Sequence, residues 1–168
     1  MDDRAEEGDG LITDRIGLGI GIRTADCVPI LLLDSETRAL GAVHAGWRGT
    51  AAGIAGGAVQ RLAAVYGSQP KNLYAAIGPA IRVCCYQVSE DVALRFSSMP
   101  GATQPDGPGK FKLDLAAANR AQMEAAGLPG SHIFDSRLCT SCLNVLFHSY
   151  RRDRAETGRM VASICRTA

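Results

Sequence analysis

The stretch CVPILLLDSETRALGAVH, residues 27–44, places two short apolar runs on either side of a polar segment. Apolar runs of this length, bounded by turn-forming residues, are typical of buried strands. The stretch therefore predicts a strand, a tight reversal and a returning strand. Cys27 and His44 lie at the outer ends of these strands, 17 positions apart (44 − 27). We expect a thiol and an imidazole to meet at one edge of a sheet.

Periodicity outside this stretch predicts a mixture of strands and helices. Apolar residues alternate with glycine at 18–22, which indicates a strand whose second face is approached closely by another segment. We predict further strands at 73–77 and 161–165, helices at 50–66, 89–96 and 114–127, and a mobile loop at 97–109. Strands and helices do not alternate regularly. The fold class is therefore α+β, with mixed β-sheets flanked by helices in a layered sandwich and a single domain over residues 1–168.

Composition excludes several classes of function. The 168 residues are 46% hydrophobic and 21% charged, with a formal net charge of +1. Such a chain has no global positive field for nucleic acid or an anionic membrane. No apolar run approaches the roughly 20 residues of a membrane-spanning helix, and the acidic start differs from a signal peptide. We expect a cytoplasmic protein with no nucleic-acid or membrane partner.

Cys27 and His44 support two kinds of chemistry. Together they provide sulfur and nitrogen ligands for zinc, or a thiolate with its general base. Each also has a structural interpretation, because free cysteine is often buried and a histidine at a strand end can bond a carbonyl. Asp26 is placed to orient His44 or a substrate hydroxyl, or to cap a turn.

A candidate anion site follows His44. Gly46 and Gly49 flank Trp47 and Arg48, and a predicted helix begins at once. Amides at a helix N-terminus together with a guanidinium favour phosphate or a ribose phosphate. The alternative is that Trp47 anchors the core and Arg48 is an ordinary surface cation. Further along, we interpret Arg151 and Arg152 as an exposed basic turn, and the alternative is that they add positive charge to the anion site.

The remaining cysteines and histidines carry weaker signals. Cys84-Cys85 and the pair Cys139 and Cys142 superficially suggest four zinc ligands. Adjacent cysteines chelate one tetrahedral ion poorly and a second Cys-x-x-Cys is missing, so we interpret them as a packed or redox-labile thiol cluster. His148 reads as part of an edge strand, or as a further metal ligand, and residue 132 as a structural histidine.

Several motifs occur in one order: TADCVP (24–29), HAGWRGT (44–50), IGP (77–79) with CCY (84–86), CT (139–140) and SYRRD (149–153). This series resembles the YfiH/LACC-type family, formerly called laccase-domain or multicopper polyphenol oxidase proteins, from about Asp9 to the C-terminus. The resemblance implies a purine nucleoside phosphorylase that also deaminates adenosine. The implied partners are purine nucleosides and phosphate.

The resemblance also implies a zinc site. Family members hold one zinc through a cysteine and two histidines, which correspond here to Cys27, to His44 and to a histidine of an upstream Val-His-Gly motif that this sequence lacks. We therefore expect an N-terminally truncated domain, or a member that completes its site differently. In this interpretation Cys27 and His44 are the metal ligands and catalytic residues. Arg48 contacts the phosphate or ribose of the substrate.

Three other functions remain open. A Cys27 thiolate activated by His44 would make a nucleophilic hydrolase or deamidase, and the fold resembles that of cysteine-dependent deamidase toxins. A copper-dependent polyphenol oxidase is disfavoured because one cysteine and one histidine do not provide several histidine clusters. The third is an inactive truncated member. Self-association of the apolar, glycine-rich start of the chain is an additional open expectation.

Overall fold

The structure, a computed structural model, describes residues 8–167, so the acidic segment 1–7 lies outside the described residues. Ten strands and five α-helices are found within that range, together with four short 3-10 helices. The strands are β1 (Gly10–Thr13), β2 (Gly19–Thr24), β3 (Val28–Asp34), β4 (Leu40–Ala45), β5 (Leu73–Ile77), β6 (Gln87–Ser89), β7 (Thr103–Pro105), β8 (Lys110–Leu113), β9 (Ile133–Asp135) and β10 (Met160–Cys165). The helices are α1 (Trp47–Ala51), α2 (Ile54–Tyr66), α3 (Glu90–Ala93), α4 (Leu115–Ala125) and α5 (Tyr150–Asp153), with η1 (Pro70–Asn72), η2 (Leu94–Phe96), η3 (Gly130–His132) and η4 (Arg154–Glu156).

The predicted pair of strands forms the centre of the main sheet. Its order is β1-β4-β3-β5-β9, with β3 antiparallel to both β4 and β5, and β9 parallel to β5. The register places Val28 opposite Ala45 and Pro29 opposite His44. The reversal at 34–38 is held by the buried Asp34, whose Oδ1 accepts hydrogen bonds from the amides of Glu36 and Thr37.

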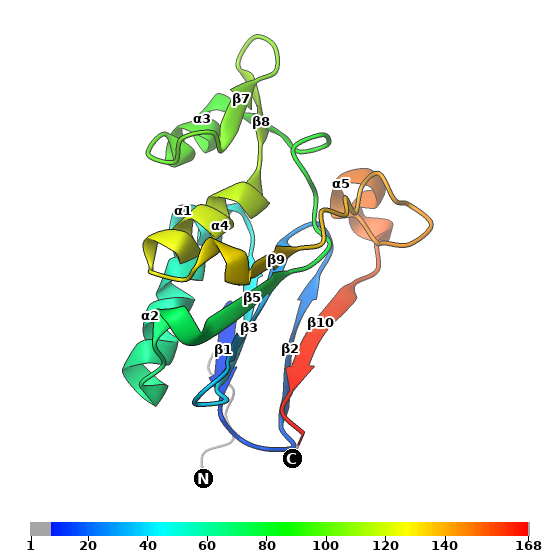
Figure 1. Ribbon diagram of the computed structural model, residues 1–168. Helices are drawn as coiled ribbons and strands as arrows, with labels where there is room; N and C mark the ends of the chain where they lie inside the picture. The colour runs from blue at the N-terminus through cyan, green and yellow to red at the C-terminus, as the bar shows by residue number, and fades with distance from the viewer. Residues whose placement is uncertain (1–7, 168) are drawn as a thin grey trace.

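Two apolar layers cover the two faces of this sheet, as the period-two alternation of β3 requires. Ile30 and Leu32 face the larger core, which α2 and α4 close on one side. Leu31 and Leu33 face a second, smaller core under the antiparallel pair β2 and β10. Figure 1 shows α1, α2 and α4 on one side of the sheet and the β2–β10 ribbon on the other. The expected layered α+β sandwich is confirmed.

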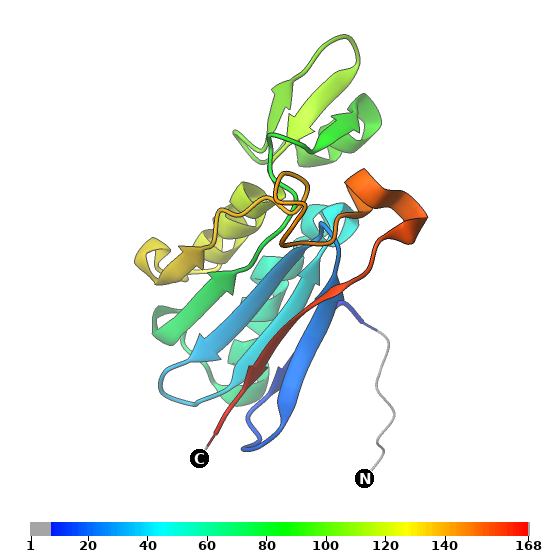
Figure 2. The ribbon, with the colours of Figure 1, turned by 90° about the vertical axis from the view of Figure 1, so that its right-hand side faces the viewer.

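A third, small sheet lies apart from the main layers. It has the order β6-β8-β7 and is accompanied by α3 at the top of the molecule in Figures 1 and 2. The segment 97–109, predicted as a mobile loop, contains β7, which pairs with β8. That prediction was wrong because a three-residue strand without apolar alternation has no periodic signal to detect.

The predicted helix 50–66 is two helices. It begins earlier, at Trp47, and is interrupted at Gly53, which adopts φ +82°. This left-handed conformation is accessible to glycine and breaks the helical hydrogen-bond ladder. The predicted helix 89–96 is likewise divided into α3 and η2. By contrast, Asp114 caps α4 as predicted, with its Oδ1 accepting from the amide of Ala117 at 2.9 Å.

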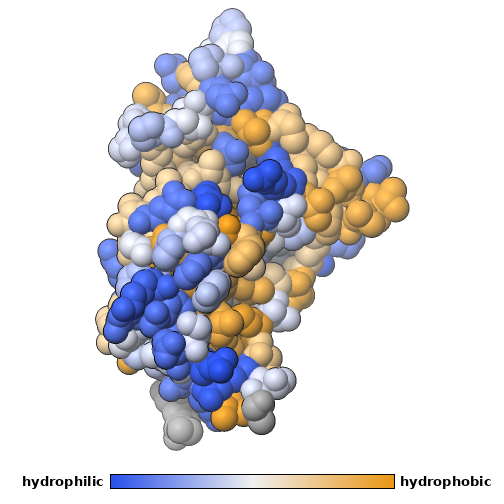
Figure 3. Space-filling view, in the orientation of Figure 1, coloured by the Kyte–Doolittle hydropathy of each residue, from blue (hydrophilic) through white to orange (hydrophobic). Residues whose placement is uncertain are grey.

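Exposed apolar side chains gather in two places. Figure 3 shows an apolar projection on the right of the molecule, where Figure 1 places α5 and the chain leading to it. There the exposed fractions of Val145 and Leu146 are 91% and 68%. Ile16 and Leu18, near the start of the chain, are 59% and 39% exposed. Self-association stays a prediction. No helix of residues 8–167 combines the length and apolarity that crossing a membrane requires.

Candidate functional site

Cys27 lies at the sharp corner between β2 and β3. Asp26, directly before it, has φ +87° and is buried. Aspartate is one of the few residues that adopt this left-handed conformation at modest cost. The corner turns the chain from one sheet layer into the other. It leaves the Cys27 side chain half-buried at the end of β3.

His44 lies on the neighbouring strand β4 and forms contacts in two directions. Its Nδ1 is 2.8 Å from Oδ1 of Asp9, which leaves Nε2 for a second partner. The largest influence on the pKa of the His44 imidazole is its hydrogen bond to the Cys27 side chain, which raises it. Burial lowers this pKa and the hydrogen bond to Asp9 raises it, and the result is a pKa of about 9. The structure therefore brings the predicted thiol and imidazole together.

Gly46 keeps space open beside this pair. A Cβ atom at position 46 would lie 3.1 Å from Sγ of Cys27 and 3.9 Å from Cε1 of His44. Any larger residue would push against the sulfur. The absence of a side chain at this position therefore keeps the sulfur of Cys27 uncrowded.

A cavity of about 330 Å³ adjoins Cys27. It is lined by residues of the 25–27 corner, α1, the 81–86 turn, the start of α4, and α5 with the residue after it: Ala25, Asp26, Cys27, Trp47, Ile81, Tyr86, Leu115, Tyr150, Arg151 and Arg154. Three aromatic residues and two arginines thus line the cavity together with one cysteine. This combination suits a flat, partly apolar ligand that carries an anionic group.

The cations near the cavity are placed by aromatic rings. The Arg48 guanidinium lies over the ring of Trp47 at 4.3 Å, and Arg151 lies over Tyr86 at 5.0 Å. Burial raises the pKa of Tyr86 to about 12, although Arg151 and Arg48 act in the opposite direction. Tyr86 is therefore a neutral phenol at pH 7. Arg48 is exposed and is not among the cavity-lining residues, so it lies outside the cavity and acts on it through its charge.

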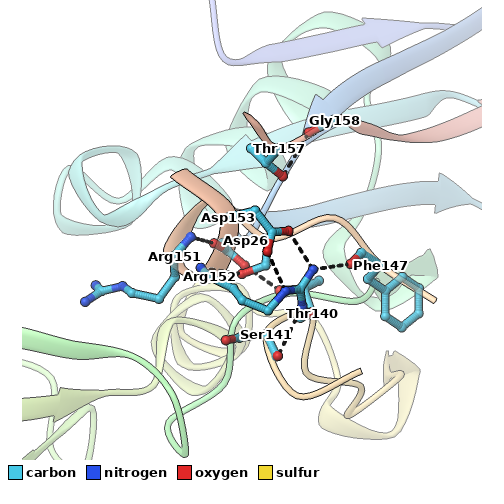
Figure 4. A network of polar contacts seen from close by, with 10 residues as sticks. Asp26, Thr140, Ser141, Phe147, Arg151, Arg152, Asp153, Thr157 and Gly158 are labelled. Carbon is cyan, nitrogen blue, oxygen red and sulfur yellow. Dashed lines mark hydrogen bonds and ion pairs between the residues drawn. The ribbon is translucent and has the colours of Figure 1, made fainter. Parts of the chain in front are cut away.

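Asp26 joins the corner to the segment that carries α5, as Figure 4 shows. Its Oδ1 accepts a hydrogen bond from the Thr140 hydroxyl and its Oδ2 from the Arg151 amide, both at 2.6 Å. The second bond satisfies an amide of the first turn of α5 that has no partner within the helix. Asp26 neither orients His44 nor caps its own turn. It holds Arg151 at the cavity wall.

Residues 151 and 152 have different roles, so their prediction as an exposed basic turn was wrong. Arg152 points into the protein, where its guanidinium binds the carboxylate of Asp153 and the carbonyl oxygens of Thr140, Ser141 and Phe147 (Figure 4). Because a guanidinium group carries five donors in one plane, Arg152 can bond several carbonyl oxygens at once and so holds the loop before α5 in place. Arg151 lines the cavity.

The other two histidines do not join the site. His132 stacks on Tyr74 and its Nδ1 lies 3.1 Å from the carbonyl oxygen of Leu73, which confirms its structural role. His148 is exposed in the chain before α5 and belongs to no strand, contrary to the prediction. Asp9 and Arg154 were not expected at the site from the sequence, and Tyr86 was noted only as part of the CCY motif. None carries a periodic or spacing signal, because they reach the site only through tertiary contacts.

Comparison with known proteins gives a consistent result. The family model described as multi-copper polyphenol oxidoreductase laccase matches residues 1–167. The chain is 48% identical over 163 residues to a protein named purine nucleoside phosphorylase YlmD from Geobacillus stearothermophilus, covering 94% of this chain and 60% of that one. It is 38% identical to adenosine deaminase RL5 from an unknown prokaryotic organism, covering 94% and 62%.

The fold agrees as well. The crystal structure of YlmD from Geobacillus stearothermophilus superposes with a TM-score of 0.91 at 45% identity, covering 95% of this chain and 61% of that one. The present chain therefore spans about 60% of the length of these relatives. The residues matched, the identity and the shared fold lead to one conclusion: the chain belongs to the family described as multi-copper polyphenol oxidoreductase laccase, whose relatives include YlmD.

Proposed function

We propose that the protein is a zinc-dependent purine nucleoside phosphorylase that also deaminates adenosine. The observation that carries the proposal is the Cys27–His44 pair beside a cavity that combines aromatic rings with guanidinium groups. Relatives named purine nucleoside phosphorylase and adenosine deaminase support the same two reactions.

The donors present fit zinc. A thiolate and an imidazole are the ligands that zinc prefers. A metal-bound histidine usually gives its other ring N–H to a carboxylate, and Asp9 occupies that position on His44. Within residues 8–167 the pair forms no three-residue ligand group with another His, Cys, Asp or Glu. We propose that the remaining positions are taken by water and by a ligand from outside these residues. Bound zinc supplies Lewis acidity and lowers the pKa of a coordinated water to about 7.

The other cavity residues suit the binding of a nucleoside and phosphate. Trp47, Tyr86 and Tyr150 offer flat apolar surface for a purine. Arg151 and Arg154 provide positive charge for phosphate, which must lie against the ribose C1′ when the glycosidic bond breaks. Arg48, the residue expected from sequence to contact the substrate, is proposed as an outer contact that raises the local phosphate concentration.

The test compares two reactions in a small set of variants. We expect Cys27→Ala and His44→Ala to abolish both phosphate-dependent cleavage of inosine and deamination of adenosine, with a parallel loss of zinc. Arg151→Gln should raise the KM for phosphate while deamination persists, and Arg95→Gln, an exposed arginine on η2, is the matched control. Full activity and unchanged metal content in Cys27→Ala would refute the proposal.

One observation favours a second candidate. The Cys27 side chain is hydrogen-bonded to His44 and is the largest influence on this imidazole, whose pKa is raised to about 9, so the two side chains are paired as a cysteine nucleophile and its base would be. This arrangement would serve a cysteine nucleophile in amide hydrolysis. Irreversible inactivation by iodoacetamide together with indifference to chelators would assign this function, whereas reversible loss of activity on zinc removal assigns the phosphorylase.

We further propose a cytoplasmic location. All six cysteines lie within the described residues and none is disulfide-bonded, as expected in a reducing compartment. Purine nucleosides and phosphate are the proposed partners there.

A further inference from the structure

Four cysteines from two distant segments converge on one point of the surface. Cys84 and Cys85 come from the turn after β5, and Cys139 and Cys142 from the loop before α5. Their four Sγ atoms all lie within 4.8 Å of one another. Cys142 is central, with its Sγ 3.7 Å from that of Cys84 and 3.3 Å from that of Cys85. Two features of the sequence had argued against a four-ligand metal site and for a packed or redox-labile thiol cluster: the adjacency of residues 84 and 85, and the missing second Cys-x-x-Cys.

Backbone hydrogen bonds explain how adjacent cysteines reach one centre. The amides of Cys85 and Tyr86 both donate to the carbonyl oxygen of Arg82 at 2.9 Å, which closes a tight turn. On the other side, a short parallel bridge joins Ala80 to Cys139, with the Thr140 amide donating to the Ala80 carbonyl at 3.0 Å. Both segments are therefore held in place by the protein itself, without any ion.

The sulfur atoms are close enough together to share one tetrahedral metal ion. With Zn–S bonds of about 2.3 Å, the edges of a tetrahedron of sulfurs measure about 3.8 Å. The two separations at Cys142, 3.7 and 3.3 Å, lie close to this edge, and no pair exceeds 4.8 Å. Small movements of exposed side chains are sufficient to complete the coordination, because Cys84 and Cys142 are exposed.

The thiols of the cluster influence one another's pKa in opposite directions. Burial would raise the pKa of the Cys139 thiol, but the backbone amides of Arg82 and Cys142 and the neighbouring thiols bring it down to about 7. Hydrogen bonds with Cys85, Cys139 and Cys84 raise the pKa of Cys142. A bound divalent cation would offset the charge of the thiolates that this geometry brings together.

We propose that Cys84, Cys85, Cys139 and Cys142 bind one zinc ion in a closed tetrathiolate site, separate from the Cys27–His44 pair. Four protein ligands leave no position for substrate, so the site is structural. It links the turn that carries Tyr86 to the loop that carries Thr140. Tyr86 lines the cavity, and Thr140 binds the carboxylate of Asp26. The ion therefore adds a second cross-link between two walls of the cavity that the Ala80–Cys139 bridge already joins.

The test reads metal binding in a Cys27→Ala background, so that the other thiol site contributes nothing. We expect this variant, purified reduced, to contain one equivalent of zinc. Replacement by Co(II) should give the intense visible and near-ultraviolet bands of a tetrahedral thiolate complex. Only Cys165 should react with a thiol reagent before a chelator is added, and four further thiols should react afterwards.

A matched pair of serine variants locates the site. Cys142→Ser should lose the zinc and the Co(II) bands, whereas Cys165→Ser, at an equally exposed cysteine on β10, should retain both. Circular dichroism verifies that each variant is folded. If Cys142→Ser is unfolded, the Cys27→Ala protein alone tests the site. The number of reactive thiols should rise when zinc is removed and fall again when zinc is added back.

Three results would overturn the inference: no zinc in reduced, folded Cys27→Ala protein, a disulfide among the four cysteines in protein prepared under reducing conditions, or zinc retained with unchanged bands in Cys142→Ser. None of these readouts uses nucleoside turnover. If the wild-type protein turned over neither inosine nor adenosine while the Cys27→Ala protein still held one zinc, the proposed function would be refuted and the tetrathiolate site would stand.

Discussion

Replacing Asp26 by alanine tests the connection between the β2–β3 corner and the cavity wall. The carboxylate accepts two hydrogen bonds of 2.6 Å, from the Thr140 hydroxyl and the Arg151 amide, at a residue whose exposed fraction is 8%. Hydrogen bonds to a charged group contribute about 1.5–3 kcal/mol each. Alanine also tolerates φ +87° poorly, at a cost of roughly 1–2 kcal/mol. We expect Asp26→Ala to lower the free energy of unfolding by about 4–8 kcal/mol.

Two further variants separate the contributions. Asp26→Gly removes the hydrogen bonds without the backbone strain, so it should be less destabilising than Asp26→Ala by about 1 kcal/mol. Thr140→Val removes one donor and keeps the side-chain shape. The double variant Asp26→Ala/Thr140→Val should be less destabilised than the sum of the single variants by about 1.5–3 kcal/mol.

Urea unfolding monitored by tryptophan fluorescence measures these differences, because Trp47 lines the same cavity as Asp26. The same samples report phosphorolysis, in which Asp26→Gly should raise the KM for phosphate through displacement of Arg151. A free energy of unfolding for Asp26→Ala within about 1 kcal/mol of the wild-type value would refute the role given to Asp26, and so would a coupling energy between Asp26 and Thr140 close to zero.

Three other outcomes are expected. Gly46→Ala places a Cβ atom 3.1 Å from Sγ of Cys27. Because the backbone at residue 46 is extended, alanine is tolerated there, so turnover should fall on the order of tenfold with stability nearly unchanged. An unaltered turnover rate would show that the added Cβ does not crowd the Cys27 sulfur. Burial raises the pKa of Asp135, but the ion pair with Arg82 outweighs burial and lowers this pKa overall. The ion pair therefore stabilises the fold at pH values above the unfolded-state pKa of about 3.9, and this stabilisation is lost as the pH falls through the lower pKa of the folded state. Acid titration of Asp135→Asn should therefore show a stability deficit at pH 7 that closes as the pH falls through the lowered folded pKa, and a constant deficit would count against the pair. Leu32→Ala, in a fully buried position, should cost about 2–5 kcal/mol in urea unfolding, against less than about 0.5 kcal/mol for the exposed control Val145→Ala.

Local patterns predicted the central part of the fold well. The apolar runs of residues 27–44 became β3 and β4 in the expected antiparallel pairing, and Asp114 capped the helix that follows it. The failures have identifiable causes. Gly53 divides a helix by adopting a left-handed conformation, and β7 is too short to show a period.

The candidate site divides in the same way. Cys27 and His44 were predictable because a hairpin brings residues at its two outer ends together regardless of the rest of the molecule. The positions of Asp9 and Arg151 could not be predicted in this way. Asp9 binds Nδ1 of His44, which is 35 positions away, and Arg151 is held at the cavity by Asp26, which is 125 positions away. Contacts over such separations depend on how the layers pack.

The amino-acid sequence by itself determined the α+β class, the central hairpin and the meeting of the thiol with the imidazole, because each follows from periodicity and from chain reversal over a short span. Tertiary structure alone decided which arginine lines the cavity, what Asp26 binds, and that four cysteines from residues 84–142 share one centre. The physical reason is that side-chain distances across separate segments are fixed by the packing of sheet, helices and turns, which leaves no periodic trace along the chain.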